Sequence, residues 1–301
     1  MKALQYSEYG PSSVLHVVDL DEPQVAAGRV RIAVRAVGVN PYDWKVRSGA
    51  FGDTSPTRLP VVPHSDAAGV VDAVGDGVEG VVVGDEVFGV AVGGASAEYA
   101  VLRFWTPKPA GMSFAEAAGM PNVVETAGRA LALLGLEKGQ TLVVNGASGG
   151  VGIAAVQLAV ARGAAVIGTA SERNHEFVRG LGAVPVTYGA GLADRIRAIA
   201  PQGVDVALDT AGRGAVAELV TLTPRPADVV SIADFEAPSH GARVTNGSEG
   251  RSWSTLTEAA ALYVEGRFTM PVDRTFPLAE AAAAHDLSES GHVRGKIFLT
   301  L

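Results

Sequence analysis

Four glycines between two apolar segments are the residues of this chain with the clearest chemical use. An apolar run over 141–145 leads into a turn with the spacing G-x-x-G-G-x-G, and a helix-compatible apolar segment follows over 153–162. Glycine backbone approaches phosphates closely, and the N–H groups of a helix N-terminus stabilise their negative charge. A second apolar run over 165–169 completes the βαβ pattern. We predict that the turn binds a dinucleotide pyrophosphate; the alternative is a turn shaped only by packing. The candidate contacts are Gly146, Ser148, Gly149, Gly150, Val151 and Gly152.

The end of the second apolar run indicates which dinucleotide binds. An NAD site needs Asp or Glu there to accept hydrogen bonds from the ribose hydroxyls. This chain has Ala170 and Ser171, followed by Glu172 and Arg173. A small residue, a hydroxyl and a guanidinium favour a 2′-phosphate, so we predict NADPH, with Ser171 and Arg173 as contacts. We expect Glu172 to face solvent in the first turn of the next helix, where an acidic side chain is favourable.

Two later segments follow predicted strands. Ligands of open α/β sheets bind at the carboxyl ends of the strands. Residues 209–212 follow a strand predicted over 204–208, and residues 231–233 end one predicted over 228–232. We expect the first segment to form part of the cofactor-site wall and the second to lie beside the nicotinamide. The candidate contacts are Thr210, Ser231, Ile232 and Ala233.

The composition is typical of a soluble α/β protein. The 301 residues are 48% hydrophobic and 19% charged, enough for one large or two ordinary domains. The net charge of −8 argues against nucleic acid and anionic membranes as partners, since both need a concentrated basic surface. No apolar run reaches the ~18 residues of a membrane span, and the first ten residues lack the apolar core of a signal peptide. We therefore expect a cytoplasmic protein.

The chain contains no cysteine, which limits its chemistry. Disulfides, thiolate nucleophiles, iron–sulfur clusters and cysteine-bound zinc are excluded. The six histidines are spread along the chain without H-E-x-x-H or a comparable pair. A site of histidine and carboxylate ligands stays open as an alternative, but we expect no metal.

The first hundred residues predict short strands separated by turns. Residues 30–39 alternate apolar with polar or small side chains, as a half-buried strand does, and similar patterns occupy 70–74, 86–90 and 97–102. We therefore predict partly barrelled sheets here. Ser113 and Glu116 form a capping box, which predicts a helix through Ala118.

From residue 141 onward strands and helices alternate, which predicts a parallel, doubly wound sheet. We predict strands over 141–145, 165–169, 184–187, 204–208 and 228–232, and helices over 123–134, 151–162, 172–181, 191–199 and 213–221. The tail from residue 264 looks turn-rich and ends in an apolar strand over 296–301, which we expect to return to the first domain. The prediction is an α/β protein with a mainly β domain (1–118 and 265–301) and a dinucleotide-binding domain (119–264).

Five motifs occur in order along the chain: residues 40–45 (NPYDWK), 63–71 (PHSDAAGVV), 84–89 (GDEVFG), 145–152 (NGASGGVG) and 295–297 (GKI). Together they resemble the zinc-independent quinone oxidoreductase branch of the medium-chain dehydrogenase/reductase superfamily, over essentially the whole chain. The resemblance implies a GroES-like catalytic domain and a Rossmann domain. It also implies NADPH as hydride donor, quinones or α,β-unsaturated carbonyls as acceptors, and a homodimer.

The resemblance also implies chemistry without a metal. Zinc-dependent relatives place a cysteine ligand where this chain has Asn40, and a His-Glu pair where it has Ser65 and Asp66. A conjugated acceptor is already electrophilic, and one hydrogen-bond donor on its oxygen stabilises the developing enolate. The Asn40 amide is our candidate donor; the alternative is a turn residue before Pro41.

The resemblance implies further site residues. Tyr42 and Lys45 are candidate proton or hydrogen-bond donors, with solvent as the alternative donor, and we expect Asp43 to brace the loop. Tyr188 matches a tyrosine near the adenosine phosphate; the alternative is a surface aromatic. Thr126 lies in a segment expected at the nicotinamide end, and ordinary helix packing is its alternative.

The chain departs from the family pattern at three places. His64 stands where glycine is common, residues 223–228 lack the usual proline–glycine–glycine turn, and Glu125 replaces the leucine of a Leu-Thr-Ala segment. His64 either lines the pocket or is a hydrogen-bonded structural histidine. These differences leave the fold prediction intact and concern the substrate pocket.

The resulting prediction is an NADPH-dependent reductase of a quinone or an α,β-unsaturated carbonyl. Two alternatives stay open: an enoyl-thioester reductase, and a non-catalytic NADPH-binding sensor or structural protein. Turnover of quinones, enones or enoyl thioesters would distinguish the three.

Overall fold

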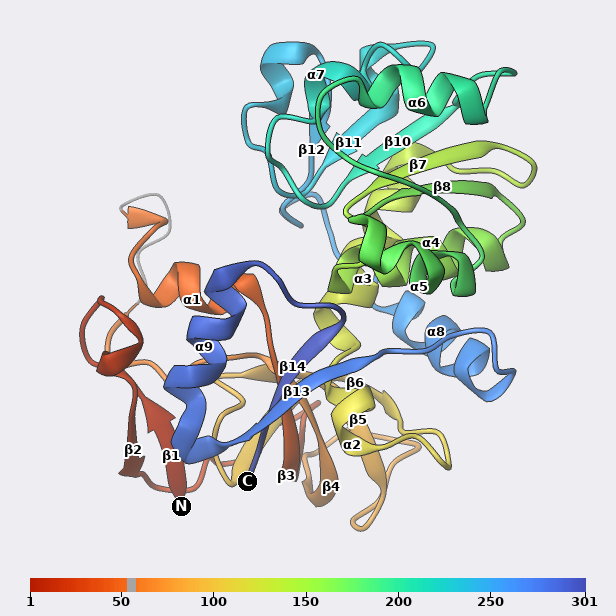
Figure 1. Ribbon diagram of the computed structural model, residues 1–301. Helices are drawn as coiled ribbons and strands as arrows, with labels where there is room; N and C mark the ends of the chain where they lie inside the picture. The colour runs from red at the N-terminus through yellow and green to blue at the C-terminus, as the bar shows by residue number, and fades with distance from the viewer. Residues whose placement is uncertain (53–57) are drawn as a thin grey trace. The chain divides into compact units, whose positions relative to one another are not determined.

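The computed structural model describes residues 1–52 and 58–301 and divides into two compact units (Figure 1). The mainly β unit comprises residues 1–122 and 269–301, and the parallel-sheet unit comprises residues 123–268. Both chain ends lie in the mainly β unit. Within the described ranges, no helix has the length and apolar character needed to cross a membrane.

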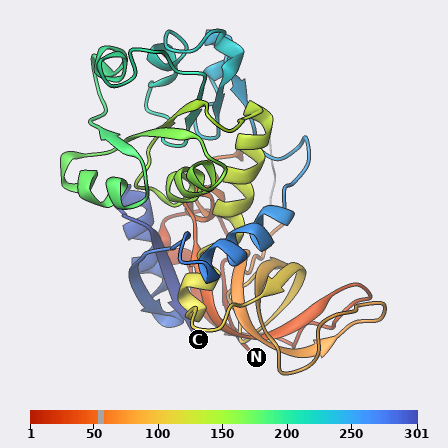
Figure 2. The same ribbon diagram turned by 90° about the vertical axis from the view of Figure 1, so that its right-hand side faces the viewer.

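The mainly β unit is built on a sheet with the strand order β13-β14-β3-β4-β5-β6, in which β3 also pairs with β6. Because of this extra pairing, the four strands from β3 to β6 form a closed ring. The predicted barrelled sheet is therefore confirmed. In Figures 1 and 2 the blue C-terminal strands lie beside the red and orange N-terminal strands, because β14 pairs antiparallel with β3. The strands are β3 (Val30–Val39), β4 (Asp66–Val74), β5 (Glu86–Val92), β6 (Tyr99–Pro107), β13 (Val272–Pro277) and β14 (Lys296–Thr300).

Shorter elements complete this unit. The predicted capping box is confirmed: the Glu116 backbone N–H donates to Ser113 Oγ at the start of α2 (Phe114–Ala118). The description of the tail as turn-rich was wrong, because it contains a ten-residue helix, α9. Its alanine-rich sequence has little apolar periodicity, so the helix gave no clear signal. The strands and α-helices of this unit that the sequence did not predict are β1 (Lys2–Gln5), β2 (His16–Asp19), α1 (Pro41–Arg47), β13 and α9 (Ala281–Ser290).

The second unit holds a parallel sheet with the strand order β12-β11-β10-β7-β8-β9, as the alternating pattern predicts. Figure 1 shows α4 and α5 on one face and α6 and α7 on the other. The strands are β7 (Thr141–Asn145), β8 (Ala165–Thr169), β9 (Val184–Val186), β10 (Val206–Asp209), β11 (Val229–Ser231) and β12 (Arg243–Val244). The helices are α3 (Pro121–Leu134, which begins two residues before this unit), α4 (Gly150–Ala161), α5 (His175–Gly180), α6 (Leu192–Ile199), α7 (Val216–Leu219) and α8 (Ser254–Val264).

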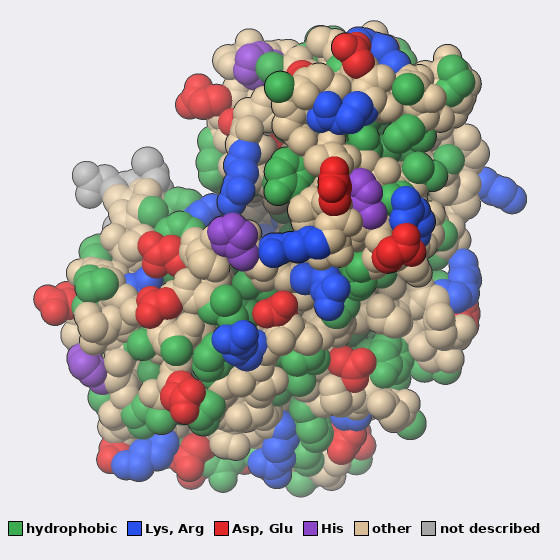
Figure 3. Space-filling model, viewed as in Figure 1, with side chains coloured by type: hydrophobic (Ala, Val, Ile, Leu, Met, Phe, Trp, Pro, Cys, Tyr) green, Lys and Arg blue, Asp and Glu red, His purple; other side chains and the backbone are tan. Residues whose placement is uncertain are grey.

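Two helices in this unit differ most from prediction. The helix expected over 213–221 is a single turn, and the helix expected over 172–181 begins as a 3-10 turn (Glu172–Asn174). The sequence did not predict β12 or α8. The strand order places β7 beside β10, where successive crossovers leave toward opposite faces, and ligands of such sheets bind at the carboxyl ends beside that point. On the face drawn in Figure 3, Lys and Arg side chains are interspersed with Asp and Glu.

Candidate functional site

A row of polar side chains runs across the carboxyl end of the parallel sheet. Each member is the last residue of its strand, and each is buried. Thr169 Oγ1 donates to Asn145 Oδ1 (2.6 Å), and Asn145 Nδ2 donates to Asp209 Oδ1 (2.8 Å). Ser231 Oγ donates to the other Asp209 oxygen (2.7 Å). Of these four residues, Ser231 was predicted as a cofactor contact and Asp209 as part of the site wall. Thr169 and Asn145 were not predicted as contacts, although their positions at strand ends could have indicated them.

The glycine turn begins beside this row. Gly146 has φ +87°, which favours glycine, and its N–H donates to Thr169 Oγ1 (2.9 Å). A Cβ at Gly152 would overlap the Gly146 carbonyl oxygen, so that glycine serves close helix packing. At Gly149, the N-cap of α4, an added Cβ would meet only Gly146 O, at 3.5 Å. Packing therefore does not require glycine at 149, whereas close approach of a ligand would.

Polar contacts link the glycine turn to the segment after β8. Asn174 Nδ2 donates to Ser148 Oγ (3.3 Å), and the Asn174 N–H donates to Ser171 O (2.8 Å). Arg173 is exposed, and it immediately precedes Asn174 in the chain. Glu172 is exposed, as expected.

The loop that carries Tyr188 is held by an arginine that was not predicted as a site residue. Arg195, on α6, donates to the carbonyl oxygens of Thr187 (3.1 Å), Gly189 (2.8 Å) and Ala190 (2.8 Å). Tyr188 itself is 55% exposed. The ring is therefore presented on an anchored loop instead of being buried in the core.

At the other end of the row, the predicted nicotinamide segment forms a tight turn. Ser231 Oγ accepts from the N–H groups of Ala233 (3.1 Å) and Asp234 (2.9 Å) while it donates to Asp209. One donor and two acceptor positions exhaust a hydroxyl, so this side chain shapes the turn. The Thr210 hydroxyl is also engaged, because Oγ1 donates to Asn145 O (2.7 Å). The other two predicted contacts, Ile232 and Ala233, are half-buried.

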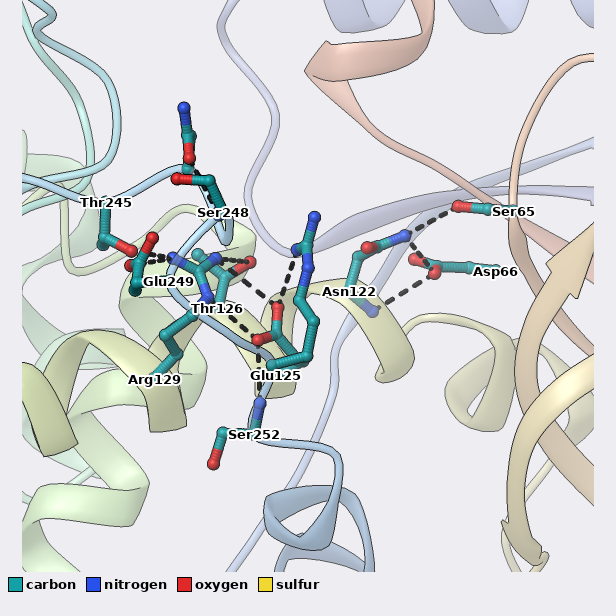
Figure 4. Close-up of polar contacts among 12 residues, drawn as sticks. Ser65, Asp66, Asn122, Glu125, Thr126, Arg129, Thr245, Ser248, Glu249 and Ser252 are labelled. Atoms are coloured by element: carbon teal, nitrogen blue, oxygen red, sulfur yellow. Dashed lines mark hydrogen bonds and ion pairs between the residues drawn. The ribbon is translucent and has the colours of Figure 1, made fainter.

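Next to this end, α3 carries a buried carboxylate with several donors (Figure 4). Glu125 accepts from Arg129 Nε (2.9 Å), Arg251 Nη1 (3.1 Å) and the Ser252 N–H (3.0 Å). Arg129 Nη2 also donates to Oγ1 of the predicted contact Thr126 (3.4 Å). Glu125, noted from the sequence as a departure, is thus the centre of a polar cluster.

In the mainly β unit, Asn40 lies at the start of α1 within a buried polar network. Lys296 Nζ donates to Asn40 Oδ1 and to Val39 O (3.0 Å), because β14 lies beside β3. Asn40 Nδ2 donates to Asp66 Oδ2 (2.9 Å). An ammonium can only donate, so Asn40 Oδ1 must face Lys296 and Nδ2 must face Asp66. The orientation of this amide is therefore fixed.

Two further groups hold the network. The Asn40 N–H donates to Asp43 Oδ2 (2.6 Å), which is the bracing role expected of Asp43. Asn122 binds Asp66 through both its backbone N–H (3.2 Å) and its Nδ2, and Nδ2 also reaches Ser65 Oγ (2.9 Å), as Figure 4 shows. Asp66, Asn122 and Lys296 were not predicted as site members.

Burial changes the protonation of this network. Desolvation raises the pKa of Asp43 to about 7 and that of Asp66 to about 6. The Asn40 hydrogen bonds and the Lys296 charge oppose these increases. Burial lowers the pKa of Lys296, against the pull of the two carboxylates. Both carboxyl groups therefore keep a proton at a higher pH than an exposed aspartate does.

His64 is hydrogen-bonded in the core of this unit, at φ +66°. Arg47 Nε donates to His285 Nδ1 (3.3 Å), so the proton of His285 lies on Nε2 and points to His64 Nε2 (3.0 Å). His64 Nδ1 must then carry its own proton, toward Ser96 Oγ (2.6 Å). Burial lowers the pKa of His64 well below its ordinary value and that of His285 to about 4, so both are neutral.

The structure does not bring Tyr42 and Lys45 into the Asn40 network. Tyr42 is 60% exposed, and its ring packs against Phe51 with centroids 5.3 Å apart. Lys45 Nζ lies 5.7 Å from the centre of the Trp44 ring. Among residues 1–52 and 58–301, no group of three or more His, Asp or Glu side chains is arranged to hold a metal ion.

Comparison with known proteins adds two family matches. Residues 26–127 match the alcohol dehydrogenase GroES-like domain, and residues 181–299 match the zinc-binding dehydrogenase family. The chain is 31% identical to the chloroplast envelope quinone oxidoreductase homolog of Arabidopsis thaliana, over 99% of this chain and 98% of that protein. It is 33% identical to an NADPH-dependent alkenal/one oxidoreductase of the same plant, over 99% of this chain and 78% of that protein.

Solved structures agree with these matches. The quinone oxidoreductase of Coxiella burnetii is 30% identical, with a TM-score of 0.87 and coverage of 100% of this chain and 99% of that one. A mycobacterial protein complexed with NADPH is 26% identical, with a TM-score of 0.84 and full coverage of both chains. The CurK enoyl reductase is 25% identical, with a TM-score of 0.86 and coverage of 99% and 98%.

Proposed function

The chain belongs to the quinone oxidoreductase branch of the medium-chain dehydrogenase/reductase superfamily, and we propose that it is an NADPH-dependent reductase of quinones or α,β-unsaturated carbonyls that works without a metal. The observation that carries the proposal is the Asn40 amide, held in one orientation by Lys296 and Asp66. A rigid amide donor of this kind suits an acceptor that gains negative charge on oxygen.

The cofactor half of the proposal rests on the parallel-sheet unit. The open turn at Gly149 and the first N–H groups of α4 suit a pyrophosphate. Ser171 and Arg173 follow β8 where an NAD site would carry an acid, which favours a 2′-phosphate. The NADPH-dependent alkenal/one oxidoreductase of Arabidopsis thaliana and the mycobacterial protein complexed with NADPH support the same choice.

The chemistry divides between the cofactor and the protein. A bound dihydronicotinamide supplies a hydride for the electron-poor carbon of the acceptor. Asn40 Nδ2 gives one hydrogen to Asp66 and offers the second to the acceptor oxygen, where it stabilises the developing charge. Lys296 polarises the amide from its oxygen side, which strengthens the N–H as a donor. The proton that completes the reduction comes from solvent or from a carboxyl group of the buried network.

The test is a steady-state screen with quinones, enones and enoyl thioesters, each with NADPH and NADH. We expect turnover of a quinone or an enone, with preference for NADPH. Turnover restricted to enoyl thioesters would favour the enoyl reductase alternative, which the CurK neighbour supports. Tight NADPH binding without turnover of any acceptor would refute catalysis and favour a sensor or structural protein.

We also propose a homodimer, as in the family that the motifs resemble. Light scattering coupled to size exclusion tests this, and a mass near the 30.8 kDa of one chain would refute it.

A further inference from the structure

Residues 246–251 have the sequence Asn-Gly-Ser-Glu-Gly-Arg and carry no apolar side chain. Such a segment cannot be held in place by burying apolar surface, so its position depends on polar contacts. It starts at the carboxyl end of the sheet: the N–H of Thr245 donates to Ser231 O (3.0 Å), beside the turn predicted to face the nicotinamide. The polar contacts that hold this segment therefore affect the end of the site where the nicotinamide is predicted to bind.

Both ends of the segment are tied to α3 through two buried side chains (Figure 4). At its start, Arg129 Nη1 donates to Oγ1 of the buried Thr245 and lies 3.5 Å from Glu249. At its end, Glu125 accepts from the Ser252 N–H (3.0 Å) and pairs with Arg251 (3.1 Å). The Glu125 side chain is fully buried, so its carboxylate is shielded from competing water.

The charges of the cluster balance. Two carboxylates, Glu125 and Glu249, face two guanidinium groups, Arg129 and Arg251. The Glu125–Arg129 pair is buried, and such a pair adds little net stability compared with an apolar side chain, because desolvation offsets the attraction. A leucine at position 125 could fill the same space in the core but could hold neither Arg251 nor the Ser252 N–H. The presence of a carboxylate at position 125 is therefore better explained by the groups that it holds in place, Arg251 and the Ser252 N–H.

We propose that Glu125 is a positioning residue that holds segment 245–252, and through Arg129 also Thr126, against the nicotinamide end of the site, and so sets how the acceptor is oriented there. This inference rests on the proposed function. It assigns a role in orientation to a residue that touches neither cofactor nor acceptor. A displacement of about 1 Å at such a site costs up to about a hundredfold in rate.

The test compares Glu125→Gln, which keeps the shape but not the charge, with Glu258→Gln as a matched control. Glu258 pairs with Arg162 (2.8 Å) in the same unit, away from the sheet end. Readouts are the NADPH Kd, kcat and KM for an enone, the emission of bound NADPH, and trypsin cleavage after Arg251. For Glu125→Gln we expect kcat/KM for the acceptor to fall about tenfold or more, changed NADPH emission and faster cleavage, with the Kd within about threefold.

A second pair of variants distinguishes a positioning role of Glu125 from a simple loss of folding. Arg251→Met removes one tie and leaves the Glu125–Arg129 pair in the core, so we expect part of the same loss, and Arg251→Lys should restore most of it. If these variants and Glu125→Gln lower only the thermal midpoint, while kcat/KM and NADPH emission match the wild type, Glu125 is a structural residue and the inference is overturned.

Failure of the proposed function would give different results from failure of the inference about Glu125. If the wild type binds NADPH but reduces no acceptor, emission and cleavage after Arg251 still decide whether Glu125 positions the segment. If the wild type does not bind NADPH, the proposed function is wrong and the inference falls with it.

Discussion

Replacing His285 by glutamine is expected to make the protein less sensitive to acid. His285 is fully buried, and burial together with the Arg47 charge lowers its pKa to about 4. In an unfolded chain the histidine pKa is about 6.5. Between these two values the unfolded chain binds a proton that the folded protein does not, so the stability due to neutral His285 is lost as the pH falls from 6.5 toward 4.

The size of the effect follows from the two pKa values. Between about pH 7 and pH 5, His285 alone should remove about 2 kcal/mol from the free energy of unfolding. Asp43 and Asp66 act in the opposite direction, because their raised pKa values let the folded protein bind extra protons in the same window. His64 adds to the acid loss. Since all three remain in the variant, the difference between the two proteins isolates His285 to first order.

Glutamine can replace both hydrogen bonds without titrating: its oxygen can accept from Arg47 and its amide can donate to His64. The assay is urea unfolding at about pH 7 and pH 5, followed by far-UV circular dichroism. His292→Gln, at an exposed position just beyond α9, is the matched control and should behave like the wild type. Equal losses of stability in the wild type and in His285→Gln would show that this histidine is not held neutral in the fold.

Three further predictions concern the site. Arg173→Ala should weaken NADPH binding about ten- to a hundredfold and leave NADH binding nearly unchanged; the control is Arg179→Ala, from an exposed pair with Glu176, and equal losses for both cofactors would contradict a 2′-phosphate contact. Asn40→Ala should lower kcat more for an enone than for a quinone, while NADPH affinity stays the same. For the enone, the activation free energy should rise by up to about 2.7–4 kcal/mol. Unchanged rates for both acceptors would show that Asn40 is only a structural residue. Activity should survive dialysis against a chelator, with no stoichiometric zinc by elemental analysis, and restoration of lost activity by zinc would contradict metal-free chemistry.

The sequence by itself determined the features that depend on neighbouring residues. The glycine turn with its flanking strand and helix, the capping box at Ser113, and the alternation of strands and helices are all written in residues close in the chain. A helix or a turn forms from such local patterns, and so these elements could be predicted. The two-residue strand β12 is too short for a period to be seen, and the pattern over 213–221 overestimated the length of α7.

Only the tertiary structure decided which side chains meet. Lys296 reaches Asn40 across 256 positions, His285 reaches His64 across 221, and Ser252 reaches Glu125 across 127. Each contact depends on strand order or helix packing, which set the neighbours of a residue without any mark in its local sequence. The row of strand-end side chains shows the same limit: Asp209 accepts from Asn145 because β10 lies beside β7, an adjacency that skips two intervening strands in the chain. Local patterns therefore determined where backbone and charge could bind a cofactor, and the three-dimensional fold determined which buried groups orient the amide and the carboxylate of the candidate site.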